Sequence, residues 1–346
     1  MKTATKKQDK RQGILAAGNF IIDRVAIIDR YPPQDDCAAI LSTKHANGGA
    51  PFNALCDWAR MGVKFPIAAA GCVGRDTDGD WIFAECKRLK INTKQLHRAT
   101  NKQTSYSEIL TESGTGRRTI FHHPGANAAF APKVLDLKAS GAKIFFLGFI
   151  GLLACMDAAD SRFGTRGARL LAEARKRGMC TAADVVTDRT GALPRLTKAA
   201  LPYLDYFFCN EIELEILTGV PTRSKQGKLD KNAIEKAAAK MRKIGRGLCM
   251  VVHAAEAAVA LTADGQVHWH GSVRVPSENI VGTNGAGDAF LAGFLAATHD
   301  GKAPSACLEQ GVCVAAASLF DSTPSAGVRD LRSCLKLGRR FGFRAG

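Results

Sequence analysis

The second half of the sequence alternates short apolar runs with amphipathic segments, and this alternation restricts the fold more than any other feature. From about residue 139 onward, segments with helical spacing separate the apolar runs KIFFLGFIG, MCTAADVV, DYFFCN and LCMVVHAA. Strands that alternate with helices in this way form a mostly parallel sheet with helices on both faces. The sequence has no internal repeat and no low-complexity linker. We therefore expect one α/β domain.

The first half of the sequence predicts a smaller β extension. The apolar run over residues 13–28 is expected to be the opening strand, and Asp23 interrupts it. Asp23 marks either a surface position or a ligand contact at the end of that strand. A helix is expected over Pro51–Met61, because Pro near the first turn and Gly after the last residue are ordinary helix punctuation. The runs TSYSEILTE and RRTIFHHPG, joined by residues 113–116, predict a hairpin.

These patterns set the expected boundaries of the domain. We expect it to span residues 13–335, with two insertions, at about residues 24–47 and 104–125, that form a small β-sheet. The two ends, residues 1–12 and 336–346, are basic and are expected to be loose.

The charge balance is strongly basic. Lys and Arg number 48 against 32 Asp and Glu, a formal net charge of +16. Part of this excess lies at the two ends, and the remaining basic residues are scattered among acids. A surface of this kind favours an anionic substrate such as ATP, and we do not expect nucleic acid as a partner.

The cysteines and the apolar runs exclude several other classes. None of the eleven cysteines forms a C-x-x-C pair, and the histidines show no zinc spacing with them, so we expect free thiols in a reducing compartment. No apolar stretch resembles a signal peptide. The longest apolar run, Ile144 to Met156, is too short to cross a bilayer, which needs about 20 residues. We therefore expect a cytoplasmic protein without a membrane partner.

The segment VGTNGAGDAFLAGFL, residues 281–295, carries the strongest chemical signal. The small residues Gly285, Ala286 and Gly287 allow backbone N–H groups to converge on an anion at the start of a helix. Asp288 follows in the first helical turn, where a carboxylate can take a proton from a hydroxyl that attacks a γ-phosphate. The alternative is that Asp288 only interacts with the helix dipole, which contributes about 0.5–1 kcal/mol.

This segment resembles the C-terminal signature of the ribokinase-like (PfkB) carbohydrate kinase family. Three further stretches agree with that family in order and spacing, and the resemblance covers about residues 13–330. They are Gly48-Gly49-Ala50-Pro51-Phe52-Asn53, Pro124-Gly125-Ala126-Asn127-Ala128, and Asn210-Glu211-Ile212-Glu213 followed by Leu217-Thr218-Gly219. The resemblance implies a ribokinase-like α/β fold with a β-sheet lid, an ATP-dependent kinase activity, and Mg²⁺ as cofactor.

The resemblance also implies roles for individual residues. Asp288 would be the catalytic base, and the amides of Gly285, Ala286 and Gly287 would neutralise the phosphoryl group. The other expected contacts are grouped by ligand. They are Asp23, Gly48, Gly49 and Asn53 for the acceptor; Thr283, Asn284, Ala254 and Ala257 for the nucleotide; and Asn210 and Glu213 for Mg²⁺ through water. A capping box is the alternative for Asn210 and Glu213, which stand three residues apart.

The chain departs from the family pattern at several positions. Gly282 stands where the family usually has Asp, which makes activation by a monovalent cation doubtful. Ala254 and Ala257 replace the glycines of a G-x-x-G element, and Ile21 replaces an Asn that contacts ribose in ribokinases. Asn284 is similar to the residue found in adenosine kinase-like members.

Alternatives to a sugar kinase remain open. One is a nucleoside kinase with the same machinery, for which Phe20, Phe52 and Phe121 are candidate stacking residues. Another is a catalytically weak sugar-binding or regulatory protein on the same fold. The Gly-rich turn lies too near the C-terminus for a dinucleotide-binding fingerprint, and the Walker A pattern is absent.

Two features are left without an assigned role. His122 and His123 adjoin the lid hairpin, and only one of them is expected to face the pocket because side chains alternate along a strand. A homodimer through the lid is expected from the resemblance alone.

Overall fold

The computed structural model describes residues 11–188, 190–245 and 247–346. A nine-stranded sheet with the strand order β15-β14-β13-β12-β11-β8-β1-β4-β5 forms its centre. Its strands are β1 (Ile14–Gly18), β4 (Ile67–Val73), β5 (Asn92–Arg98), β8 (Ile144–Ile150), β11 (Cys180–Val185), β12 (Tyr206–Asn210), β13 (Cys249–His253), β14 (Ala257–Leu261) and β15 (Val267–Gly271). All pairs from β5 to β13 are parallel, and β14 and β15 are antiparallel at one edge. The expected mostly parallel sheet is confirmed.

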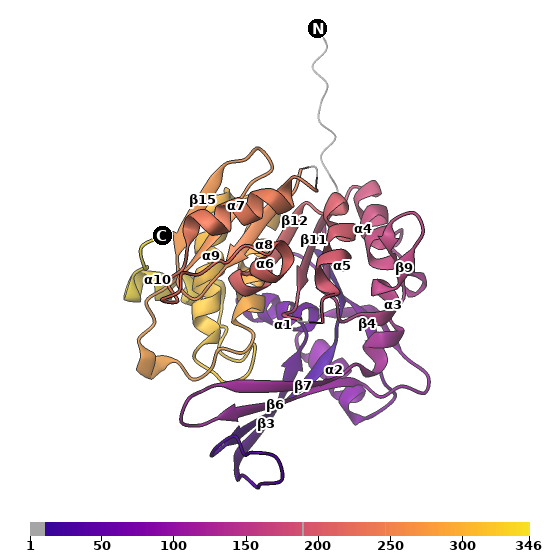
Figure 1. Ribbon diagram of the computed structural model, residues 1–346. Helices are drawn as coiled ribbons and strands as arrows, with labels where there is room; N and C mark the ends of the chain where they lie inside the picture. The colour runs from indigo at the N-terminus through magenta and orange to yellow at the C-terminus, as the bar shows by residue number, and fades with distance from the viewer. Residues whose placement is uncertain (1–10, 189, 246) are drawn as a thin grey trace.

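Helices cover both faces of this sheet (Figure 1). One face packs against α1 (Ala50–Met61), α2 (Thr77–Arg88), α8 (Ala286–His299), α9 (Pro304–Ser318) and α10 (Leu331–Phe341). The other face packs against α3 (Ala154–Asp157), α4 (Arg166–Lys176), α5 (Leu193–Ala200), α6 (Glu211–Thr218) and α7 (Lys231–Arg242). Short elements complete the chain: η1 (Gly125–Ala129), η2 (Pro132–Val134), η3 (Leu201–Tyr203), η4 (Ser277–Asn279) and the pair β9 (Ala159–Asp160) and β10 (Gly164–Thr165).

A separate four-stranded sheet projects from one end of the α/β body and is called the lid (Figure 1). Its strands, in the order β3-β2-β6-β7, are β2 (Ile21–Ile28), β3 (Ile40–Gly48), β6 (Ser105–Glu112) and β7 (Arg118–His123). Strand β2 pairs antiparallel with β3 and parallel with β6. Both expected insertions therefore contribute strands to the same sheet.

The opening run of residues 13–28 is not one strand, contrary to expectation. Strand β1 ends at Gly18 in the large sheet, and β2 begins at Ile21 in the lid. Gly18 has a φ of 132°, and a side chain there would overlap the carbonyl oxygen of Gly148. A glycine is needed at this bend, and it lets one apolar run serve two sheets.

The C-terminal end is not loose, so the expectation for residues 336–346 was wrong. Helix α10 is capped by Asp330, which accepts a hydrogen bond from the Ser333 amide. Beyond the helix, Phe343 pairs with Val273 and packs against a small apolar cluster. The expectation rested on the basic residues of this segment, but these residues share the helix with an apolar side that packs against the protein. The expected loose segment at the other end, residues 1–12, lies mostly outside the described residues.

Across the described residues, none of the helices combines the length and the apolar character that crossing a membrane requires.

Candidate active site

The site is built around the first turn of α8. Gly285 precedes the helix with a φ of 74°, and no side chain caps the free amides of that turn. A Cβ atom on Gly285 would lie 2.5 Å from Cβ of Pro324, so the turn packs tightly on the loop after α9. Asp288 is the third helical residue, and burial raises its pKa to about 6. A partly buried carboxylate thus lies in the first helical turn beside amides that no side chain caps, which is the position that the sequence predicted for it.

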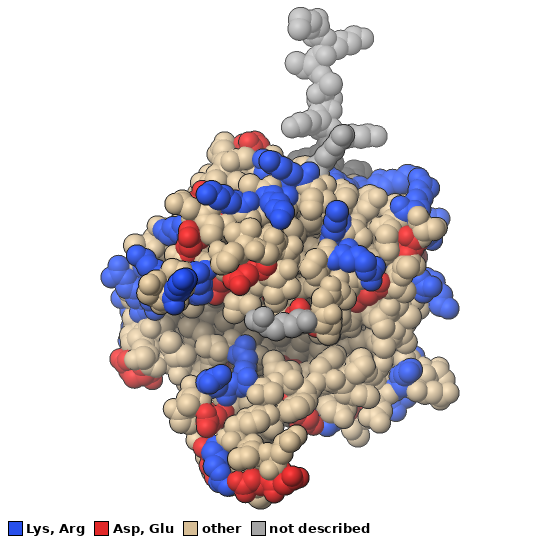
Figure 2. Space-filling model, viewed as in Figure 1, with Lys and Arg blue, Asp and Glu red and all other residues tan. Residues whose placement is uncertain are grey.

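A cavity of about 550 Å³ opens in front of this turn. It lies between the carboxyl ends of the large sheet's strands, α8 and the lid, and Figure 2 shows the hollow between the lid and the α/β body. Several predicted site residues that are far apart in the sequence line it together. They are Asp23, Gly49, Asn53, Asn210, Glu213, Thr283, Asn284, Gly285, Ala286, Gly287 and Asp288.

Asp23 faces this cavity rather than the solvent. It is buried on β2, and burial raises its pKa to about 7, while a hydrogen bond from Asn284 opposes the shift. Nδ2 of Asn284 donates to Oδ2 of Asp23 at 3.2 Å. Gly48 lies opposite Ile21 in the neighbouring strand and does not line the cavity. A side chain on Gly48 would overlap the Asp23 carboxylate, so this glycine makes room for Asp23.

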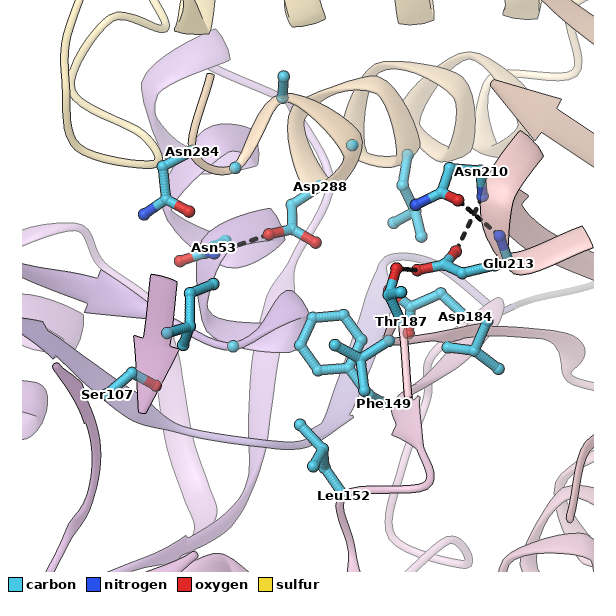
Figure 3. Close-up of a pocket in the computed structure, with 18 of the residues that line it drawn as sticks. Asn53, Ser107, Phe149, Leu152, Asp184, Thr187, Asn210, Glu213, Asn284 and Asp288 are labelled. Atoms are coloured by element: carbon cyan, nitrogen blue, oxygen red, sulfur yellow. Dashed lines mark hydrogen bonds between the residues drawn. The ribbon is translucent and has the colours of Figure 1, made fainter. Parts of the chain in front are cut away.

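Asn53 contacts Asp288 directly (Figure 3). Its Nδ2 donates to Oδ2 of Asp288 at 2.7 Å, and its Oδ1 accepts from Nδ2 of Asn47 at 2.7 Å. The hydrogen bond from Asn53 lowers the pKa of Asp288, against the larger effect of burial. Asn53 was predicted to contact the substrate that accepts the phosphoryl group. In the structure, both ends of its side-chain amide are hydrogen-bonded to other protein groups.

Asn210 and Glu213 form the capping box of α6 (Figure 3). Oδ1 of Asn210 accepts from the Glu213 amide, and Oε2 of Glu213 accepts from the Asn210 amide, both at 2.8 Å. Oε1 of Glu213 also accepts from the Thr187 hydroxyl at 3.0 Å. Both residues nevertheless line the cavity, and burial raises the pKa of Glu213 to about 7. The capping box is thus present in full.

Asp184 is a cavity residue that the sequence did not single out. It stands at the end of β11, and its Oδ1 is buried without a hydrogen-bond partner. Burial raises its pKa well above the usual value, and Asp288 and Glu213 add to this. Oδ1 lies against Gly148, but the residue lines the cavity together with Glu213, and two carboxylates near one another are a donor set that suits a hydrated Mg²⁺ ion. Within the described part of the chain, no compact group of three His, Cys, Asp or Glu is placed to hold a metal, so water would complete the shell.

The lid contributes a row of side chains from β7. Arg118, Ile120 and His122 alternate along this strand and all line the cavity, which is the periodicity expected for one face of a strand. Nη1 of Arg118 donates to the Thr283 hydroxyl at 2.9 Å and so links the lid to the segment before α8. Sequence reasoning missed Arg118, although its spacing from His122 placed both on one face.

Only one of the two adjacent histidines faces the cavity, as predicted. His122 lines the cavity and its Nδ1 lies 3.2 Å from the Ser107 hydroxyl, while its Nε2 is buried without a partner. Burial lowers the pKa of His122. His123 instead packs on the ring of Tyr106, with the ring centroids 5.0 Å apart.

Ala254 and Ala257 do not line the cavity. The Ala254 amide donates to the Ala257 carbonyl at 2.9 Å and closes the turn between β13 and β14. Gly282 also lies outside the cavity lining, and a Cβ atom there would lie 2.8 Å from Cα of Ser322. An Asp at position 282 therefore does not fit this loop without a shift of its backbone.

The three phenylalanines considered for stacking are not in the cavity. Phe20 and Phe52 are fully buried in the core, where their rings pack together with centroids 5.5 Å apart. Phe121 is 54% exposed and does not line the cavity. Phe149, near the end of β8, and Leu152, just after that strand, supply apolar surface to the cavity instead (Figure 3).

Comparison with known proteins agrees with this architecture. The chain is 25% identical over 329 residues to ribokinase from Arabidopsis thaliana, covering 94% of this chain and 80% of the relative. It is 33% identical over 116 residues to adenosine kinase 1 from the same plant, a match that covers 32% of each chain.

Solved structures show the same fold. The structure of Arabidopsis thaliana ribokinase complexed with ribose and ATP matches with a TM-score of 0.75 at 21% identity, over 94% of this chain and 98% of that one. The Burkholderia thailandensis nucleoside kinase in complex with inosine matches with a TM-score of 0.72 at 15% identity, over 96% and 98%. The ribokinase-like fold is confirmed. A family model described as pfkB family carbohydrate kinase matches residues 12–330, and the chain therefore belongs to the PfkB family of carbohydrate kinases.

Proposed function

We propose that this kinase transfers the γ-phosphoryl group of ATP to a hydroxyl of a small sugar or sugar-like molecule, with Asp288 as the base. One observation carries this proposal. A partly buried carboxylate, Asp288, stands in the first turn of α8 beside amides that no side chain caps, within a cavity that the lid covers. Relatives that are named for sugar phosphorylation and that span most of the chain support the substrate class.

Asp288 would take the proton of the acceptor hydroxyl. Its Oδ2 accepts from Asn53, so Oδ1 is the oxygen that receives the proton. The acceptor oxygen then bonds to the γ-phosphorus as the bond to the β-phosphate bridging oxygen breaks, and ADP leaves. A base whose pKa is about 6 is ionised at neutral pH and still accepts a proton readily.

Charge on the transferred phosphoryl group would be stabilised from two sides. The amides of Gly285, Ala286 and Gly287 lie at the start of α8, where the helix dipole favours an anion; the Ala286 amide makes only a long bond of 3.4 Å, to the Thr283 carbonyl. The Arg118 guanidinium reaches this region from the lid through its contact with Thr283. Fixed donors in a site shielded from water stabilise such charge more than water does.

Asp184 and Glu213 would hold Mg²⁺ through water, with Asn210 keeping Glu213 in place. Asp184 and Glu213 both line the cavity, and each lies near enough to Asp288 for its pKa to be raised by that carboxylate, which supports this assignment. When bound, Mg²⁺ neutralises phosphate charge and orients the nucleotide. Activation by a monovalent cation stays doubtful, because Gly282 offers no carboxylate.

A nucleoside acceptor is the second candidate. The acceptor half of the cavity places the polar groups of Asp23 and Asn284 next to an apolar surface formed by Ile21, Ile109, Ile120, Phe149 and Leu152. The polar groups suit a sugar hydroxyl, and the apolar surface suits the flat ring of a nucleobase. Partial matches to adenosine kinases support this alternative. A catalytically weak binding protein is less well supported, since Asp288 and its contacts are intact.

We also propose a homodimer through the lid. Ile40 and Leu41 on β3 and Phe121 on β7 are each more than half exposed, and exposed apolar side chains on one small sheet favour association. Light scattering on the purified protein and on Leu41→Arg tests this, and a monomer in both samples would contradict it.

Release of ADP with Mg·ATP across a panel of sugars, sugar phosphates and nucleosides tests the function. Asp288→Asn keeps the size of the side chain and removes the base, so turnover should fall by at least about 10²-fold, while ATP binding survives. Asp300→Asn, at the exposed end of the same helix, is the matched control and should keep full turnover. Normal turnover of Asp288→Asn would exclude Asp288 as the base.

A further inference from the structure

Four buried polar residues form a network behind Asp288. Asn53 and Asp57 are four residues apart on α1, so their side chains project from the same face of that helix. Asn47 comes from the end of β3, and Ser325 comes from the loop after α9. The exposed fraction is 7% for Asn47, 3% for Asn53 and zero for both Asp57 and Ser325. Most polar groups buried this deeply are hydrogen-bonded, and here this holds for Asn47, Asn53 and Ser325.

The hydrogen bonds of this network have a fixed direction. Nδ2 of Asn47 donates to Oδ1 of Asn53 at 2.7 Å and to Oγ of Ser325 at 3.0 Å. Because Oδ1 of Asn53 faces Asn47, Nδ2 of Asn53 faces Asp288 and donates to it at 2.7 Å. Turning the Asn53 amide over would place its oxygen against a carboxylate oxygen and its nitrogen against the nitrogen of Asn47.

Ser325 joins the network to the backbone and to Asp57. Its hydroxyl donates to the Asn53 carbonyl at 3.3 Å while it accepts from Asn47. Neither carboxyl oxygen of Asp57 makes a hydrogen bond of ordinary geometry, although Ser325 is near enough to lower its pKa. Burial outweighs this and raises the pKa of Asp57 well above its usual value. This raised pKa favours the neutral form of Asp57, and a neutral carboxyl group can donate to the Ser325 hydroxyl, which has a lone pair to spare.

We propose that Asn47, Ser325 and Asp57 are positioning residues for phosphoryl transfer, which fix the Asn53 amide with its nitrogen toward Asp288. This inference rests on the proposed role of Asp288 as the base. A hydrogen bond donated to a carboxylate favours its ionised form, so a fixed Asn53 keeps the base ionised despite its burial. A network that no longer fixes Asn53 makes Asp288 harder to ionise.

Other charged or titratable groups also act on Asp288 from the elements around it. Arg118 on β7 is the cation among them, and His253 on β13 packs against Gly287 of the same helical turn. The carboxylates whose pKa values Asp288 raises are Asp23, Asp57, Asp184 and Glu213. Apart from Asp57, which Ser325 also contacts, none of these groups loses a partner when the Ser325 hydroxyl is removed, so Ser325→Ala acts on the network and leaves the other charges near Asp288 in place.

The test is the pH dependence of kcat/KM for the acceptor at saturating Mg·ATP. In the unchanged enzyme the acidic limb should lie near pH 6. Ser325→Ala and Asn47→Leu should each move this limb upward by about one pH unit, which lowers kcat/KM about tenfold at pH 5 and hardly changes it at pH 8. Asp57→Asn should leave the limb in place, because an amide can donate to Ser325 as a neutral acid does.

Ser318→Ala is the matched control. Ser318 is a buried serine at the end of α9 whose hydroxyl donates only to the Ala315 carbonyl, at 2.8 Å. A purely structural role of Ser325 predicts that both serine variants lose stability, and that activity falls equally at all pH values. Coincident acidic limbs in Ser325→Ala and the unchanged enzyme would overturn the inference.

Two further outcomes separate the possible failures. An upward shift of the limb in Asp57→Asn would show that Asp57 does not act as a neutral donor and would overturn its part in the network. If Ser325→Ala does not fold, Asn47→Leu takes its place, and coincident acidic limbs in Asn47→Leu and the unchanged enzyme would then overturn the inference. Full turnover of Asp288→Asn would refute the proposed base itself, whereas an inactive Asp288→Asn beside unshifted limbs would refute the network alone.

Discussion

Substitution of Gly285 by Ala tests whether the turn before α8 must keep its present position. Gly285 and Gly301 flank the same helix, with φ values of 74° and 75°. A left-handed conformation costs an alanine about 1–2 kcal/mol at either position. A Cβ atom on Gly301 would meet nothing within 4 Å, whereas one on Gly285 would lie 2.5 Å from Cβ of Pro324. The second glycine is therefore a matched control for backbone strain.

The expected magnitudes differ because only one variant is crowded. Gly301→Ala should lower the free energy of unfolding by about 1–2 kcal/mol. Gly285→Ala must also displace Pro324 or the helix, which adds about 1–3 kcal/mol. A shift of the first turn of α8 by about 1 Å would move Asp288 and the neighbouring amides, and displacements of that size lower rates by about 10²-fold.

Urea unfolding and ADP release measure the two effects separately. Gly301→Ala should be less stable with nearly unchanged turnover, and Gly285→Ala should be less stable still and lose most of its turnover. Equal losses of stability, together with normal turnover in Gly285→Ala, would refute the argument that the contact with Pro324 positions the turn.

Two further predictions follow from the charges in the cavity. As the proposed base, Asp288 must be ionised to accept a proton, and its pKa is raised to about 6, so kcat/KM should fall about tenfold for each pH unit below 6. Stability should change in the opposite direction. The raised pKa means that the folded protein binds this proton more tightly than the unfolded chain does, so the contribution of Asp288 to the free energy of unfolding decreases as pH rises from about 4 to 6. Arg118→Met should lower turnover by at least about tenfold with little loss of stability, because it removes the cation near Thr283 and Asp288 but little buried surface; steady-state kinetics with unchanged kcat and KM would contradict this.

The sequence was sufficient to predict the parts of the structure that depend on local patterns. The strands of the large sheet are apolar runs bounded by helices, and the turn before α8 is specified by adjacent small residues. Strand β5 was not predicted, because its segment NTKQLHR is largely polar and at the edge of the sheet. Helix α10 was missed because its basic residues dominate the composition of the last residues.

The sequence predicted those residues of the candidate site that belong to a recognisable local motif, but not how the motifs contact one another. Asp288 and Asn53 belong to two separate motifs, and nothing in the sequence indicates that their side chains meet at 2.7 Å. Arg118, Asp184 and Ser325 enter the site through tertiary contacts with segments that are distant in the sequence. Residues of this kind have no local pattern of their own, so only the folded chain identifies them.

The balance of effects on Asp288 indicates what closure of the lid does to the base. Burial is the largest cause of its raised pKa, and Arg118 from the lid lowers that pKa by a smaller amount. The lid strands line the cavity together with α8, so an opening of the lid would admit water to Asp288 and withdraw Arg118 at the same time. The two changes would act on the pKa of Asp288 in opposite directions: added water would lower it, and loss of the cation would raise it. If Asp288 is the base as proposed, the share of its burial that the lid supplies decides whether closure makes it a stronger base, and exclusion of water by the closed lid would in either case favour transfer to the acceptor over hydrolysis of ATP.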